Sequence, residues 1–231
     1  MKDIRELTSI QVRIFPADYI PYSYLLRKEF VDYIVNKYNF TSNEMPFENL
    51  PGDAPKIIVF RSGEYKIEKK KIIIKQLTFE NRRIVTESLS TSKEANKLFS
   101  LIARDIKKFQ IEGQFRLSDV DYFGEETSCV VSLNVDCMSI FSPKMGAFLN
   151  DDLLNKLKHE AFEIYPKSVR FEISFKPEEK LMKKRITLSP KRLILEPRTE
   201  HSLDQKVFFT KSPSDTDTHL NMLHLFEKRM N

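Results

Sequence analysis

Two stretches of the sequence, 124 residues apart, repeat one pattern in which a polar run leads into an amphipathic helix. Residues 86–106 read TESLSTSKEANKLFSLIARDI, and residues 210–230 read TKSPSDTDTHLNMLHLFEKRM. Superposed without a gap, the two stretches match three hydroxyl residues and five apolar residues. The apolar residues are Leu98, Phe99, Leu101, Ile102 and Ile106, which coincide with Met222, Leu223, Leu225, Phe226 and Met230. Apolar residues at helical spacing form one buried stripe, so we predict the same inward face in both helices.

The residues that precede each helix are suited to begin it. Thr91 and Glu94 form a capping box, and Asp215 is a good N-cap at the equivalent place in the second stretch. Further upstream, residues 84–85 and 208–209 are pairs that favour β-structure. The sequence therefore predicts a strand followed by a capped helix in both places. Chance similarity between two common strand–helix units is the alternative.

The rest of each half follows the same order of predicted elements. Residues 9–15 and 129–137 alternate apolar and polar side chains as half-buried strands do. Amphipathic helices are predicted at about 22–38 and 151–165. The strands that follow them are predicted at 56–61, 71–74 and 77–80 in the first half, and at 168–175, 186–188 and 192–196 in the second.

This order of elements predicts an α+β protein built from two pseudo-symmetric strand–helix–strands–helix repeats. An antiparallel sheet with the helices on one face would bury a single apolar layer. The first repeat is expected to span residues 1–110 and the second residues 129–231. Residues 111–128, with five acidic side chains and one basic side chain, are expected to form an acidic connector between them.

The order strand, helix, four strands, helix, written twice, resembles the saddle of the TATA-box-binding protein and the domains that share its topology. The closest local likeness is RIVTESLSTSKEANKLFSLIARDIKKF, residues 83–109. The resemblance implies that fold. Members of the family kink DNA with pairs of phenylalanines on the sheet, and no such pairs can be assigned here. The face opposite the helices is expected to carry Arg13, Asn134, Asp136, Arg170 and Glu172, and its acidic side chains would repel phosphate.

Basic residues form two triplets at corresponding places in the two halves. They are Lys69, Lys70 and Lys71, and Lys183, Lys184 and Arg185. Each triplet precedes a short β-favouring run, which predicts a basic hairpin in each half. Twin hairpins of this kind could hold two phosphates of a nucleic acid backbone without reading its sequence. The alternative is that these lysines belong to solvated turns and protected edge strands.

Signals for catalysis, metal binding and cofactor binding are absent from the sequence. The chain has five glycines and no phosphate-binding loop, and it has no G-x-S-x-G motif. His219 and His224 are five residues apart and would lie about 140° apart around a helix. Cys129 and Cys137 lie in one alternating run and are expected to be small core residues. The alternative is that one of them is a catalytic thiolate. We therefore expect no metal and no cofactor.

Two classes of function remain. The first is a non-enzymatic binding module whose partner is nucleic acid or another protein. The second is an RNA-processing enzyme, since tandem α+β halves with basic surfaces resemble the repeat-RNA endonucleases of CRISPR systems. Those enzymes typically carry a glycine-rich loop near the C-terminus, whereas Gly146 is the last glycine here. A pseudo-symmetric protein–protein interaction scaffold that binds only its own copies is a third, separate possibility. We expect the binding module.

The sequence predicts a cytoplasmic protein with no membrane partner. No uncharged apolar run approaches the length of about 20 residues that a membrane-spanning helix needs, and the first residues lack the pattern of a secretory signal. The net charge of +5 permits an anionic partner. The oligomeric state does not follow from the sequence.

Overall fold

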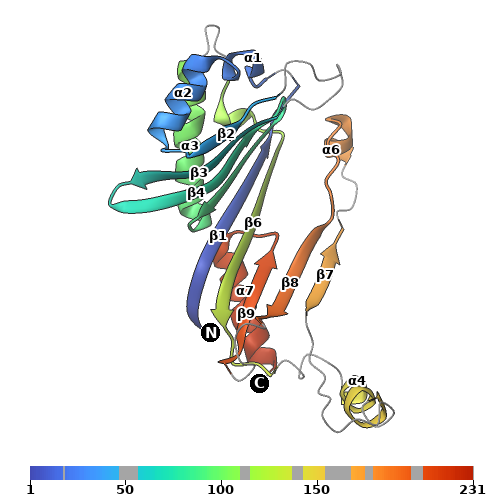
Figure 1. The fold of residues 1–231 in the computed structure, drawn as a ribbon. Helices are drawn as coiled ribbons and strands as arrows, with labels where there is room; N and C mark the ends of the chain where they lie inside the picture. The colour runs from blue at the N-terminus through green and yellow to red at the C-terminus, as the bar shows by residue number, and fades with distance from the viewer. Residues whose placement is uncertain are drawn as a thin grey trace.

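The computed structural model describes residues 1–17, 19–46, 57–109, 115–136, 143–153, 168–174, 179–198 and 205–230. Within these residues the chain forms an α+β structure in which nine strands make one antiparallel sheet. The strands are β1 (Lys2–Ile14), β2 (Ser42–Glu44), β3 (Ile58–Ile67), β4 (Lys70–Phe79), β5 (Arg83–Leu89), β6 (Tyr122–Ser132), β7 (Val169–Ile173), β8 (Lys191–Pro197) and β9 (Val207–Ser212). Their order across the sheet is β2-β3-β4-β5-β1-β6-β9-β8-β7 (Figure 1).

Helices connect and follow these strands. They are α1 (Tyr22–Leu25), α2 (Lys28–Lys37), α3 (Ser92–Lys108), the 3-10 turn η1 (Leu117–Asp119), α4 (Pro143–Ala147), the π-helical turn η3 (Phe148–Leu153), α6 (Glu179–Lys183) and α7 (Thr216–Met230). In Figure 1, α3 and α7 run behind the strands. The prediction of an α+β protein with an antiparallel sheet is confirmed. The predicted connector at 111–128 includes the first residues of the central strand β6.

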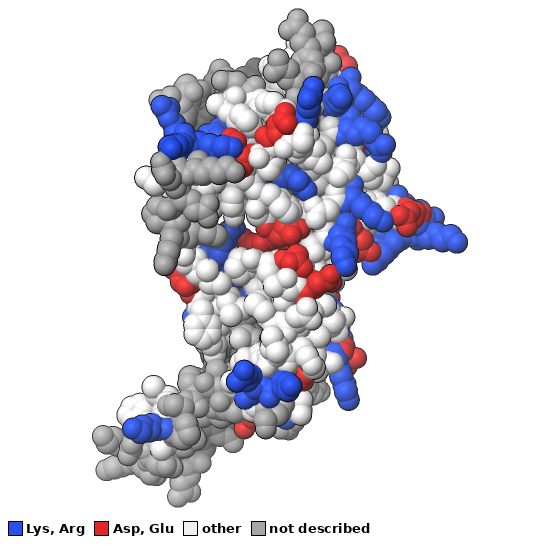
Figure 2. Space-filling model, turned by 180° about the vertical axis from the view of Figure 1, so that it is seen from behind, with Lys and Arg blue, Asp and Glu red and all other residues white. Residues whose placement is uncertain are grey.

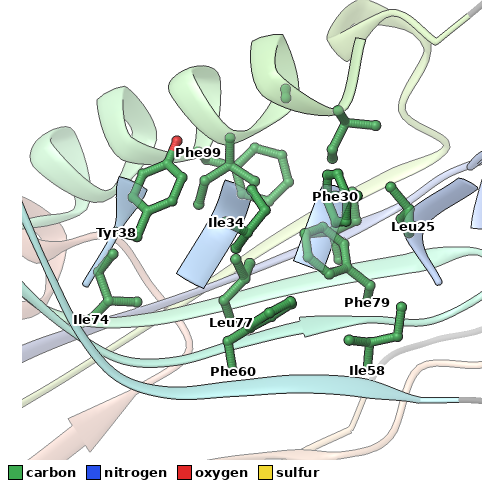
Figure 3. Close-up of a cluster of buried hydrophobic side chains, with 14 of the residues drawn as sticks. Leu25, Phe30, Ile34, Tyr38, Ile58, Phe60, Ile74, Leu77, Phe79 and Phe99 are labelled. Carbon is green, nitrogen blue, oxygen red and sulfur yellow. The ribbon is translucent and has the colours of Figure 1, made fainter. Parts of the chain in front are cut away.

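The larger hydrophobic core lies between the sheet and helices α1, α2 and α3 (Figure 3). Apolar residues from β3, β4 and β5 meet apolar residues from the three helices there. The labelled side chains are Leu25, Phe30, Ile34, Tyr38, Ile58, Phe60, Ile74, Leu77, Phe79 and Phe99. Burial of these aliphatic and aromatic surfaces is the main stabilising term for this part of the fold.

A smaller core lies between α7 and the strands β6, β8 and β9. Its buried members are Cys129, Val131, Leu133, Val135, Leu195, Phe208 and Leu223. Phe99 and Leu223 are both buried, as predicted from the repeated helical stripe. Leu225 is 58% exposed, so its predicted inward position was wrong. The buried residues of α7 are Thr216, His219, Leu223 and Glu227, which define a face that turns Leu225 away from the sheet.

The two faces of strand β1 point to the opposite sides of the sheet from those predicted. Gln11 is fully buried beneath α3, and Arg13 donates to the side chain of Asn96 on α3 at 2.6 Å. Arg13 was expected on the face opposite the helices, and that expectation was wrong. Ile10, Val12 and Ile14 are only partly buried and lie on the other face. The N-terminal turn of α3 crosses above β1, so polar side chains of β1 face it, and Gln11 donates to the carbonyl of Ser92 at 3.1 Å.

A buried carboxylate joins α2 to α3. Asp105 of α3 is fully buried and accepts hydrogen bonds from Lys37 at 2.6 Å, from the hydroxyl of Tyr38 at 2.6 Å and from the hydroxyl of Tyr33 at 3.0 Å. Burial alone would raise the pKa of Asp105, but hydrogen bonds led by that from Lys37 outweigh it and hold the pKa below its ordinary value. Asp105 is therefore ionised and bonded in the folded protein at neutral pH.

Candidate nucleic-acid interface

The first basic triplet lies at the β3–β4 hairpin, as predicted. A tight two-residue turn joins the strands, and Glu68 within it adopts a left-handed conformation with φ of 56°. Lys69 is exposed at the turn. Lys70 is 2.6 Å from Glu94 at the start of α3, and Lys71 forms an ion pair with Glu64 of β3. The hairpin is therefore basic, but two of its three predicted contact residues already have carboxylate partners.

The second triplet does not lie at a hairpin. Lys183 is the last residue of α6, and Lys184 and Arg185 follow in a turn, with Arg185 at a φ of 54°. Lys184 forms an ion pair with Asp121, and its carbonyl accepts a hydrogen bond from Arg82 at 3.3 Å. Lys184 therefore fastens this segment to the end of the sheet. The strand predicted at 186–188 is absent, because β8 begins only at Lys191.

The structure does not bring the two triplets together. In Figure 1 the β3–β4 hairpin projects on one side of the molecule, and α6 lies on the other. The prediction of equivalent twin hairpins is therefore wrong in its geometry, because the residues that precede 183 form a helical turn and not a strand. Whether either triplet contacts nucleic acid stays a prediction.

The face of the sheet opposite α2, α3 and α7, called the open face here, offers a larger surface. Residues opposite each other in neighbouring strands share a face, so the register identifies its members. One row runs across five strands through Val59, Thr78, Val85, Val12 and Gly124. A second row runs through Thr8, Ser128, Lys211, Ile194 and Arg170. Val85, Val12, Ile194 and Phe209 on this face are only partly buried, whereas Val59, Thr78 and Thr8 are buried.

Two acidic side chains on the open face are paired with bases. Glu126 forms ion pairs with Lys191 and with Lys211, the latter at 2.7 Å. Burial would raise the pKa of Glu126, but hydrogen bonds from these two lysines hold it below its ordinary value. Glu196 accepts from the Nε of Arg170 at 3.0 Å. These pairings do not involve Asp136 and Glu172, the acids predicted to repel phosphate on this face, so that repulsion stays a prediction. Lys191 and Lys211 were missed by sequence reasoning, which weighted runs of lysine over single lysines within strands.

The opposite, helix-bearing face is acidic near its middle, where the N-termini of α3 and α7 meet (Figure 2). The first residues of the two helices bond each other reciprocally. The amide of Ser92 donates to the hydroxyl of Thr216 at 2.8 Å, and the amide of Thr216 donates to the hydroxyl of Ser92 at 2.9 Å. Glu94 and Asp217 lie in the first turns of these helices, where negative charge offsets the helix dipoles. This face is therefore less suited to bind phosphate.

A buried cluster beneath α7 contains the pair of residues that most resembles a catalytic dyad. The Sγ of Cys129 is 3.7 Å from the Nε2 of His219, and the hydroxyls of Thr210 and Ser212 bond the same imidazole at 2.9 and 2.7 Å. Burial raises the pKa of the Cys129 thiol and lowers the pKa of His219 to about 4. Both groups are therefore neutral at neutral pH, which disfavours the thiolate–imidazolium pair of a cysteine nucleophile.

Beneath α3, at the position that corresponds to Thr210, a buried hydroxyl has no hydrogen-bond partner among the described residues. The Oγ1 of Thr86 is buried and has no hydrogen-bond partner among the described residues, whereas the Oγ1 of Thr210 bonds His219. We expect Thr86→Val to leave stability unchanged or raise it, and Thr210→Val to cost about 1–3 kcal/mol, the penalty for an unpaired buried polar group. Thermal unfolding of the two variants measures this. Equal losses would show that the Thr86 hydroxyl is hydrogen-bonded in the folded protein.

Within the part of the chain that the structure describes, no group of three or more metal-ligating side chains is found, and no helix is long and apolar enough to cross a membrane. Cys137, His159 and His201 lie outside the described residues. No protein-family model matches this chain, and no curated protein is significantly similar to it. Any functional conclusion therefore depends on the fold and on the chemistry of its surfaces.

Proposed function

We propose that this protein is a non-enzymatic binding module that holds nucleic acid against the open face of its sheet, with the β3–β4 hairpin adding phosphate contacts. A single observation carries the proposal: the open face bears partly exposed aliphatic side chains among lysines and arginines, while α2, α3 and α7 all cover the other face. Such a surface offers apolar contact, and the exposed Lys66 and Lys69 of the β3–β4 hairpin supply positive charge for phosphate contacts that do not depend on base sequence.

We further infer that the chain consists of two pseudo-symmetric repeats of the kind found in the TATA-box-binding-protein fold. Gln11 lies opposite Thr86 and Cys129 lies opposite Thr210. Gln11 and Cys129 are 118 residues apart, and so are Ser9 and Thr127, which lie opposite each other where β1 and β6 meet. This register is what a two-fold axis between Ser9 and Thr127 would produce.

Hydrogen bonds around that axis support the same inference. The hydroxyls of Ser88 and Ser90 are 2.7 Å apart, and those of Ser212 and Ser214 are also 2.7 Å apart, at positions 124 residues further on. Ser92 and Thr216, which bond each other reciprocally, are another two positions 124 residues apart. A repeat of this kind places the two halves of the open face side by side, so that one continuous surface is offered to an extended ligand.

The open face differs from that of the DNA-kinking family members. Its partly exposed residues at the centre are Ile10, Val12, Ile14 and Val85, with Phe209 towards the second half, so phenylalanine pairs are absent from these positions. Without apolar wedges of that kind we expect little bending of a duplex. Binding should instead depend on phosphate contacts and fall steeply with salt.

The contribution of the β3–β4 hairpin to binding is tested by replacing lysines that form no ion pair among the described residues. Lys66 lies opposite Lys71 in the hairpin, and neither Lys66 nor Lys69 has an ion-pair partner among the described residues. We expect Lys66→Gln/Lys69→Gln to weaken binding to all sequences alike and to lower the log–log salt slope by about 1.4–1.8. Arg104→Gln/Lys107→Gln removes the same charge from the exposed side of α3 and should have little effect.

The open face itself is tested by adding a carboxylate at its centre. Val85→Glu should abolish binding of labelled single-stranded and duplex oligonucleotides at low salt, since the new charge lies among the proposed contacts. Ser100→Glu, on the exposed side of α3, is the matched control. Absence of binding by the unmodified protein at about 100 µM, the weak end of typical non-specific affinity, would reject the proposal. Equal effects of Val85→Glu and Ser100→Glu would place the contact elsewhere.

A further inference from the structure

The two outer edges of the sheet are built differently. At one end, β2 has only three residues, Ser42–Glu44, all polar and exposed, which is a common way to prevent pairing with another chain. At the other end, β7 is longer and contains Val169, Phe171 and Ile173. Among the described residues β7 pairs only with β8, and no other described strand lies along its outer edge (Figure 1).

The exposed apolar residues of β7 lie on one face of the sheet. Val169 lies opposite Leu195, and both belong to the smaller core on the helix-bearing side. Since alternate residues of a strand share a face, Phe171 and Ile173 point to that same side. Phe171 is nevertheless 55% exposed and Ile173 is 41% exposed. An edge strand with large exposed apolar residues is favourable for pairing with another strand.

We propose that β7 pairs with β7 of a second copy of this chain, antiparallel and centred on Phe171. The strand VRFEI is complementary to itself in this register. Arg170 of each copy lies opposite Glu172 of the other, Val169 lies opposite Ile173, and the two Phe171 side chains lie opposite each other. Opposite charges and aromatic residues at directly facing positions both stabilise antiparallel pairs.

The charged residues of β7 remain exposed and can reach a second copy. Arg170 bonds Glu196 of β8, and its side chain remains 54% exposed. Glu172 lies opposite Arg192 in the β7–β8 register, and its side chain is exposed. Each charge can therefore face the second copy without leaving its own sheet. The proposal does not depend on nucleic-acid binding.

A strand pair of five residues is a small interface, below the roughly 1,200 Å² of a stable complex. We therefore expect a weak dimer, seen as a rise in mean mass by sedimentation as the protein concentration increases from about 5 to 500 µM. Glu172→Arg should keep the protein monomeric over this range, since it places two arginines opposite two arginines. Ile73→Lys, a change at an exposed apolar residue of the interior strand β4, should leave dimerisation unchanged.

A mixing experiment separates this pairing from any other dimer. Arg170→Glu and Glu172→Arg should each be monomeric alone and should form a heterodimer when mixed, because each acid then faces a base. Phe171→Cys should form an intermolecular disulfide on mild oxidation, as facing Cα atoms in antiparallel strands are about 4.5–5.5 Å apart. Ile73→Cys should not. A strictly monomeric protein, a dimer indifferent to Glu172→Arg, or no heterodimer from folded variants would overturn the proposal.

Discussion

Replacing Asp105 by alanine is expected to lower the free energy of unfolding by about 3–5 kcal/mol, the usual cost of removing one partner from a buried ion pair. The substitution leaves the ammonium of Lys37 and the hydroxyl of Tyr38 without their acceptor between α2 and α3. Figure 3 shows the Tyr38 hydroxyl pointing towards α3. Urea unfolding of Asp105→Ala measures the loss. Asp32→Ala, at an exposed position of α2, is the control and should change stability little.

A double-mutant cycle distinguishes loss of the hydrogen bonds from loss of packing. In a Tyr38→Phe background, Asp105→Ala no longer leaves a buried hydroxyl unpaired, so it should cost less by about 1–3 kcal/mol. Additive losses would mean that Tyr38 and Asp105 act independently. Since the pKa of Asp105 is held below its ordinary value of 3.8, its contribution is fully present above that pH and is lost only in stronger acid.

Stability is expected to fall by about 3 kcal/mol between pH 6.5 and pH 4 because of His219 alone. Burial lowers the pKa of His219 to about 4 from an ordinary value of 6.5. The unfolded chain therefore binds a proton as the pH falls through 6.5, while the folded protein stays neutral at this site until about pH 4. Protonation thus favours the unfolded state throughout this window.

Two substitutions test the assignment to His219. His219→Gln should be less stable at pH 7, because it disturbs the bonds to Thr210 and Ser212, but it should lose the fall in stability between pH 6.5 and 4. His224→Gln, at an exposed position of the same helix, should retain it. A wild-type protein whose stability is constant over this range would show that His219 is not held neutral by burial.

The sequence predicted helix caps, buried helix positions and the first basic turn, because each of these depends on residues only a few positions apart. The capping box of Thr91 and Glu94 is present as predicted, and Asp215 accepts from the amide of Thr218 at 3.0 Å. The inward positions of Phe99 and Leu223 follow from helical spacing. The basic turn at Lys69 follows from a charged gap between two strand-forming runs.

The direction in which each face points was decided by the tertiary structure. Alternation in β1 separates Ile10 and Val12 from Gln11 and Arg13, but a period of two does not say which set is inward. The N-terminal ends of α3 and α7 meet above the centre of the sheet, and their polar groups require polar partners there. Gln11 and Arg13 therefore face the helices, and Ile10, Val12 and Ile14 of β1 lie on the open face.

Which single charged side chains form ion pairs was likewise decided by contacts between segments far apart in the sequence. Lys184 pairs with Asp121 and Lys191 pairs with Glu126, and both partners are more than 60 residues away in the sequence. Spacing along the chain carries no information about such pairs, because they form only when the sheet brings the strands together. The sequence by itself determined which segments form strands and helices and where basic residues concentrate. Only the packed sheet decided which of these bases are paired with acids, which face the described helices leave uncovered and which edge strand lacks a second partner among the described residues.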